Sequence, residues 1–85
     1  MNGTIDNDLL KNLDKIHTTA LGVERIRKNL NLNTEDVVNW CKEKIAKAGD
    51  IFRQGKNWYV RVDDCVITIN AHSFTIITAH KQKST

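Results

Sequence analysis

The feature of this chain that most constrains its fold is a set of three consecutive strand-like segments between Asn57 and Lys81. Apolar and polar side chains alternate with a period of two in residues 58–62, 65–70 and 74–80, which is typical of half-buried β-strands. A two-residue loop at Asp63-Asp64 predicts these opposed pairs: Val62 with Cys65, Val60 with Ile67 and Trp58 with Ile69. A second loop, either Ala71-His72 or the four residues 70–73, places Ile69 opposite Phe74 and Ile67 opposite Ile76.

Both predicted hairpins assign the apolar side chains to the same face of the sheet. The predicted inner face consists of Trp58, Val60, Val62, Cys65, Ile67, Ile69, Phe74 and Ile76. Because a shift of one residue would move a whole strand's apolar set to the other face, this agreement favours an antiparallel meander packed on helices.

The opposite face is predicted to be mixed, with more apolar area than exposure to solvent requires. It would carry Tyr59, Arg61, Val66, Thr68, Asn70, Thr75, Ile77, Ala79 and Lys81. Ordinary β-propensity is one explanation, since Val, Ile and Thr favour strands even when wet. A surface for a protein partner or for a homodimer is the other. The candidate binding residues are Tyr59, Arg61, Val66, Thr68, Thr75, Ile77 and Lys81.

Helical periodicity precedes the strands. Apolar spacing and capping residues predict helices over residues 6–17, capped by Asp6, over 20–30, and over 34–48, capped by Asn33 or Thr34. Leu21, Ile26 and Leu30 mark the second helix. The period changes after Asp50, and a short strand is predicted at 51–53. The predicted fold is α+β, with three N-terminal helices on one face of a four-stranded antiparallel meander.

Length and composition favour a single domain over residues 1–85. The first residues show neither a basic start nor an apolar stretch of the signal-peptide kind, and no apolar run is long enough to span a membrane. We therefore expect a cytoplasmic protein with no membrane partner, in which Cys41 and Cys65 are free, buried thiols. The net charge of +3 comes entirely from residues 53–85, so an anion-binding surface would lie there.

His72 and His80 are the candidate catalytic residues, because imidazole titrates near neutral pH. With Tyr59, Arg61 and Lys81 they would supply an acid, a base and a cation for metal-independent RNA cleavage. The predicted register, however, turns His80 to the side of Phe74 and Ile76, away from Arg61. No cofactor or metal site is predicted, since the separation of the two histidines matches no known ligand spacing and no carboxylate lies nearby.

Nucleic-acid binding without catalysis has two versions. In one, Tyr59 and Arg61 of the sheet stack on bases and contact phosphates. In the other, three helices and a hairpin form a winged helix, and the third helix enters the major groove. That helix begins near Glu35 and Asp36, which would repel phosphates, so the winged helix is disfavoured.

Four segments carry a resemblance to a known family: GVERIRKNL (22–30), DVVNWCKEKI (36–45), GKNWYV (55–60) and CVITINAHSFTIITAHK (65–81). Over positions 16–81 the chain resembles a small bacterial family known as a domain of unknown function, which implies a cytoplasmic bacterial or phage protein but no catalytic residues. A weaker likeness, in the final TIITAH strand, is to the barnase–EndoU–colicin–RelE group of nucleases.

The sequence thus leads to three functional hypotheses. The first is a binding module that uses its C-terminal sheet to bind a protein partner or itself. The second is a ribonuclease or toxin that uses the histidines of the last hairpin, and the third is a nucleic-acid binder without catalysis.

Overall fold

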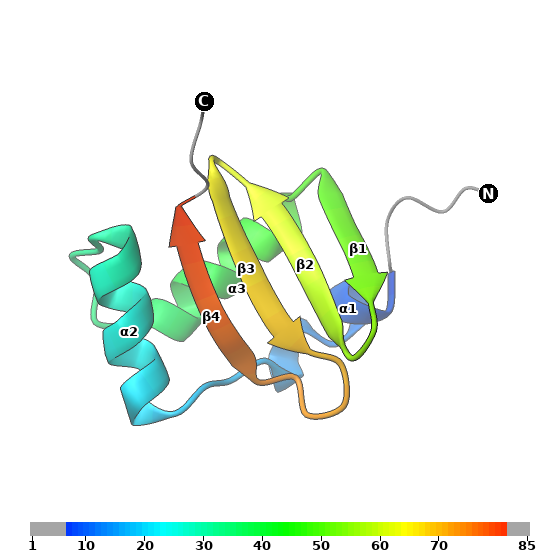
Figure 1. The fold of residues 1–85 in the computed structure, drawn as a ribbon, viewed down its shortest axis with the longest axis horizontal. Helices are drawn as coiled ribbons and strands as arrows, with labels where there is room; N and C mark the ends of the chain where they lie inside the picture. Colours follow the sequence, from blue (N-terminus) through cyan, green and yellow to red (C-terminus); the bar gives the residue numbers. More distant parts are fainter. Residues whose placement is uncertain (1–6, 82–85) are drawn as a thin grey trace.

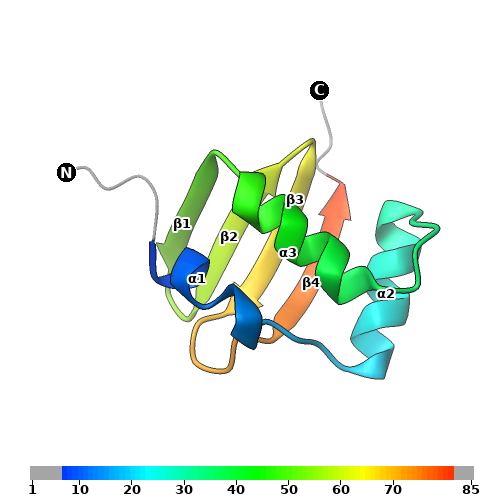
Figure 2. The same cartoon turned by 180° about the vertical axis from the view of Figure 1, so that it is seen from behind.

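The protein is a four-stranded sheet with helices on one face and at one edge. The elements are α1 (Asn7–Lys11), the 3-10 turn η1 (Leu13–Lys15), α2 (Ala20–Leu30), α3 (Val37–Lys47), β1 (Asp50–Gln54), β2 (Asn57–Val62), β3 (Cys65–Asn70) and β4 (Ile76–Lys81). The computed structural model describes residues 7–81, and its antiparallel strands follow the order β1-β2-β3-β4. Figure 1 shows the face that no helix covers, and Figure 2 shows α1 and α3 lying on the other face, with α2 beside β4. The predicted α+β class is confirmed.

The first predicted helix, residues 6–17, is in fact divided into α1 and η1. The side chain of Asn12 explains the break, because its Nδ2 donates to the carbonyl of Asp8 at 2.8 Å. Such a bond competes with the backbone bonds that would continue the helix. The proposed cap, Asp6, lies outside the described residues.

Helix α2 begins where predicted but packs through different residues. Thr19 caps it by accepting from the backbone N–H of Gly22, and Asn31 ends it with φ of 54°. Leu21 was predicted to belong to the buried stripe of this helix, and that prediction is wrong. Leu21 is 77% exposed, and Gly22 is buried in its place. A side chain at Gly22 would collide with the hydroxyl of Thr18, so close packing selects the glycine.

Helix α3 begins later than predicted. Its N-cap is Asp36, whose carboxylate accepts from the N–H of Asn39 at 3.1 Å, and neither Asn33 nor Thr34 fills this role. Thr34 instead accepts from the N–H of Asp36. The predicted stripe of Val37, Cys41 and Ile45 is buried as expected.

The hairpin between β2 and β3 has the predicted register. Val62 pairs with Cys65, Val60 with Ile67 and Trp58 with Ile69. Asp63 and Asp64 form the two-residue loop with φ of 49° and 65°. Two positive φ values are the signature of the type I′ turn, whose twist matches that of the strands it joins.

The last hairpin differs from the prediction in two ways. Its loop is longer, so that Ile69 pairs with Ile76 and Ile67 pairs with Ala79. A β-bulge opposite the Thr68–Ile69 step adds Ile77 to β4. Because the extra residue shifts the alternation of the strand, Ala79 is buried rather than on the outer face, and Lys81, paired with Cys65, belongs to the row of the inner face.

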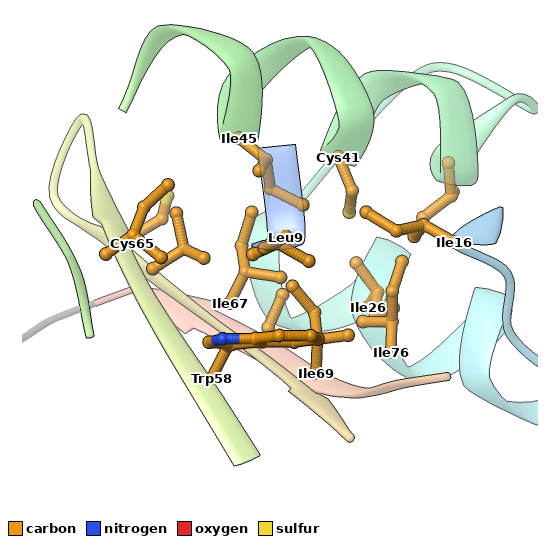
Figure 3. Packing of buried hydrophobic residues seen from close by; sticks show 14 of the residues in the cluster. Leu9, Ile16, Ile26, Cys41, Ile45, Trp58, Cys65, Ile67, Ile69 and Ile76 are labelled. Carbon is orange, nitrogen blue, oxygen red and sulfur yellow. The ribbon is translucent and has the colours of Figure 1, made fainter. Parts of the chain in front are cut away.

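The core lies between the inner face of the sheet and the helices. Figure 3 shows Cys41 and Ile45 of α3 above Trp58, Ile67 and Ile69 of the sheet. All five of these residues are at most 2% exposed. Val62 and Phe74, also predicted for this face, are half-buried and pack at its border. The predicted inner face is therefore confirmed for β2, β3 and Ile76, and it gains Ile51 and Ala79. Phe74 packs against it from the loop before β4 and not from the strand.

Candidate functional site

The face of the sheet that no helix of residues 7–81 covers is the most distinctive surface of the described structure (Figure 1). We call it the open face and define it by two rows of cross-strand neighbours. One row runs through Phe52, Tyr59, Thr68 and Thr78, and the other through Asp50, Arg61, Val66 and His80. Within these rows, Tyr59, Arg61, Val66 and Thr68 lie on the predicted side of the sheet.

An aromatic pair occupies the β1–β2 side of the open face. The rings of Phe52 and Tyr59 are stacked, with centroids 5.5 Å apart and planes at 24°. Both side chains are half-buried although no helix of residues 7–81 covers this face of the sheet. Phe52 was absent from the predicted site, since its place opposite Tyr59 follows only once the Gly55-Lys56 turn is treated as a two-residue loop.

Arg61 is held against this aromatic pair. The central carbon of its guanidinium lies 5.6 Å from the centroid of the Phe52 ring, and its Nη1 is 3.7 Å from a carboxylate oxygen of Asp50. The aromatic face and the carboxylate both attract the cation, so the charge of Arg61 is largely matched on its own surface. The open face is consequently close to neutral near its centre.

His80 lies on the open face, in the same row as Arg61, and the expectation that the two would point to opposite sides is wrong. Both residues are cross-strand neighbours of Val66. His72, by contrast, belongs to the loop at the other end of β4. The structure therefore separates the two candidate histidines by the length of that strand.

The other predicted binding residues lie apart from the two rows. Ile77 is the bulge residue and is 41% exposed, whereas Lys81 follows the row of the inner face. Thr75 precedes β4 in the loop, where its hydroxyl contacts His17. The open face thus keeps four of the seven predicted binding residues and lacks the other three: Thr75, Ile77 and Lys81.

A hydrogen-bonded chain at the 70–75 loop was not foreseen from the sequence. His17 Nδ1 donates to the carbonyl of Lys15 at 2.9 Å, and Nε2 of the same ring lies 3.1 Å from the Thr75 hydroxyl. Thr75 in turn lies 2.7 Å from the hydroxyl of Ser73. His17 and Thr75 are 58 positions apart, so no local pattern could have linked them.

This chain of side chains ties the loop together. Asn70 accepts from the backbone N–H groups of His72 and Ser73, and Phe74 has φ of 60°. The described residues enclose no pocket beside Thr75 or elsewhere. The arrangement resembles an activated hydroxyl, but it has no cavity to hold a substrate next to it.

The two cysteines are buried and free, as predicted. Burial raises the pKa of the Cys41 thiol to about 12, and the neighbouring Cys65 thiol adds to the increase. Burial likewise raises the pKa of Cys65. Neither sulfur is a nucleophile at neutral pH, because the thiolate is the reactive form. Within residues 7–81 no three His, Cys, Asp or Glu side chains gather where they could hold a metal ion.

The comparisons with known proteins identify a family and no function. A model of the family described as "Protein of unknown function (DUF3781)" matches residues 10–80, so the chain belongs to this family. Searches of curated proteins and of solved structures found no significant match. Among the described residues, no helix has the length and apolarity needed to cross a membrane.

Proposed function

We propose that this member of the DUF3781 family is a binding module whose open face receives a partner protein. The observation that carries the proposal is the stacked pair of Phe52 and Tyr59, half-buried on a sheet face that no helix of residues 7–81 covers. Tyr and Arg are enriched among the residues that dominate binding energies, and Arg61 lies beside the pair.

The chemistry of the partner follows from the charges. The centre of the open face is nearly neutral because Asp50 lies beside Arg61. The C-terminal half of the chain, residues 53–85, has five basic and two acidic residues. A fitting partner would present an apolar patch, which covers Tyr59 and Val66, within an acidic border.

The proposal is tested by photo-crosslinking in cells that naturally produce the protein. A photoreactive phenylalanine analogue replaces Tyr59 in one variant and Lys28, on the exposed side of α2, in a control variant. We expect a discrete crosslinked protein from position 59 alone, and its loss when Val66→Asp is added. Equal crosslinking from both positions, or insensitivity to Val66→Asp, would reject the open face as the interface.

Single-stranded nucleic acid is a second candidate occupant of the same face. The observation that favours it is the position of Arg61 beside the aromatic pair, since bases stack on aromatic rings while cations contact phosphates. Fluorescence anisotropy with single-stranded RNA tests it. Salt-sensitive binding that Tyr59→Ala weakens and His80→Ala spares would support nucleic acid over protein.

A further inference from the structure

The two edges of the sheet differ in how far their outward backbone groups are hydrogen-bonded. Along β4, the backbone of His17 forms a short parallel bridge to the start of the strand. The N–H of His17 donates to the carbonyl of Phe74 at 3.1 Å, and the N–H of Ile76 donates to the carbonyl of His17 at 2.8 Å. Two further backbone carbonyls of this edge accept hydrogen bonds from side chains. Thr18 Oγ1 donates to the carbonyl of Ile76, and Asn29 Nδ2 donates to the carbonyl of Ala79. Helix α2 lies beside the same strand (Figure 1). This edge is closed.

The β1 edge has no such cover within residues 7–81. In an antiparallel ladder, hydrogen-bonded and non-hydrogen-bonded pairs alternate. Gln54 and Asn57 flank a two-residue loop and therefore form a hydrogen-bonded pair. The alternation then assigns the backbone hydrogen bonds to β2 to three residues of β1: Gln54, Phe52 and Asp50. Ile51 and Arg53 therefore direct their backbone N–H and C=O groups away from the sheet.

The strand also lacks two of the devices that usually protect an edge. It contains no proline, and the β1–β2 pairing runs without a bulge. Its one cation, Arg53, is folded back along the sheet, where its guanidinium lies 5.6 Å from the Trp58 ring centroid and its Nε donates to the carbonyl of Gly55. The backbone of β1 is left ready to pair.

We propose that two copies of the chain associate through β1, antiparallel and about a two-fold axis that passes beside Phe52. In this register Phe52 faces Phe52 of the second copy, Ile51 faces Arg53, and Asp50 faces Gln54. About four backbone hydrogen bonds form, from Ile51 and Arg53 of each copy.

Two alternative symmetric registers are less favourable. One places Arg53 opposite Arg53, which sets like charges against each other. The other places Ile51 opposite Ile51, which leaves Gln54 beyond the paired strand and sets Asp50 against the Phe52 ring. Only the Phe52-centred register overlaps all five residues of β1.

The pairing joins the two open faces into one surface. The aromatic row continues from Tyr59 and Phe52 of one copy to Phe52 and Tyr59 of the other, on a sheet of twice the width. This inference goes beyond the proposed function and does not depend on it, because pairing uses the backbone of β1 and needs no third molecule.

Sedimentation of the full chain over a range of concentrations measures the association. We expect a weak dimer, with a Kd of roughly 10 μM to 1 mM, because strand pairing covers less than the roughly 800 Å² per partner of a standard interface. Arg53→Pro removes an outward N–H and no bond to β2, so it should keep the fold and raise the Kd at least tenfold. Arg53→Ala, which keeps the N–H, is the matched control and should stay dimeric.

A cysteine pair tests the register, whether or not the proline variant folds. Residues that face each other in a non-hydrogen-bonded pair have Cα atoms about 4.5 Å apart, a separation that a disulfide spans. Under a mild oxidant, Phe52→Cys should give a covalent dimer and Gln54→Cys should not, since the two copies of Gln54 lie apart. A monomer at millimolar concentration, a folded Arg53→Pro dimer of unchanged Kd, or equal crosslinking at both positions would overturn the proposal.

Discussion

Arg61 and His80 lie on the same face of the sheet, one on each side of Val66. They share this row because Ile77 is an extra residue in β4, which reverses the alternation of the strand beyond it. The same residue turns Ala79 into the core. A single bulge therefore places His80 on the open face and Lys81 in the row of the inner face.

The separation of the two candidate histidines predicts how the protein behaves with RNA. Since His72 lies in the loop before β4 and His80 lies near the far end of that strand, they cannot act as an acid–base pair on one phosphate. We expect wild-type protein, His72→Ala and His80→Ala to leave total RNA equally intact over hours of incubation. Cleavage that either substitution abolishes would identify a ribonuclease instead.

The bulge predicts an unusual tolerance to deletion. Removing Ile77 leaves Ile76 facing inward, Thr78 outward and Ala79 inward, so the deletion variant should fold as a regular hairpin. Removing Thr68 from β3 should unfold the protein, because it shifts part of the strand by one residue and turns apolar side chains to solvent. Circular dichroism and thermal unfolding of the two variants would distinguish these outcomes, and equal stability would contradict the assignment.

Adjacent residues of β3 should differ sharply in their contribution to stability. Ile67 is fully buried, and Ile67→Ala should lower the free energy of unfolding by about 2–5 kcal/mol through lost transfer energy and a cavity. Val66 lies on the open face and is half-buried, so Val66→Ala should cost clearly less. Urea unfolding of both variants measures the difference. A similar cost at the two positions would mean that something covers the open face in the free protein.

The Lys44–Asp63 ion pair joins α3 to the β2–β3 turn and predicts a pH effect. Lys44 Nζ lies 2.7 Å from Asp63 Oδ2, and this hydrogen bond lowers the pKa of Asp63 below its ordinary value. The stabilisation is therefore present above the pKa of the unfolded carboxyl, near 3.8, and is lost as the pH falls through the folded-state pKa. The effect is small because both groups are solvated.

Asp63→Asn is the informative variant, because asparagine also tolerates the positive φ of this turn. Between pH 7 and pH 3 its urea midpoint should fall less than that of wild type. Asp64→Asn, in the same turn, is the control and should follow wild type. High salt should narrow the difference between wild type and Asp63→Asn at pH 7, because it screens exposed charges.

The accuracy of sequence-based prediction differs between the two long hairpins for a physical reason. Asp63 and Asp64 allow one short loop, and that loop fixes every pair between β2 and β3. The last hairpin depends on the side chain of Asn70, which accepts from two backbone N–H groups and so supports a longer loop. Neither this loop nor the bulge at Ile77 has a signature in the alternation of residues 74–80.

The candidate site was predicted correctly where the register of its strands was predicted correctly. Tyr59, Arg61, Val66 and Thr68 lie on strands whose register followed from the Asp63-Asp64 loop, and all four lie on the open face. Phe52 was missed because the first strand is short, and His80 was misplaced because of the bulge. The contact between His17 and Thr75 depends on tertiary structure alone.

The bridge between His17 and Thr75 has a consequence for the order of folding. The two residues are 58 positions apart, whereas the hairpins of the sheet close through short loops. Local hairpins form within microseconds, while a closure over most of the chain must first overcome its entropy. During synthesis the ribosome makes the His17 segment long before β4. The last strand therefore emerges toward a segment that is already present, and its edge need not stay exposed to other nascent chains.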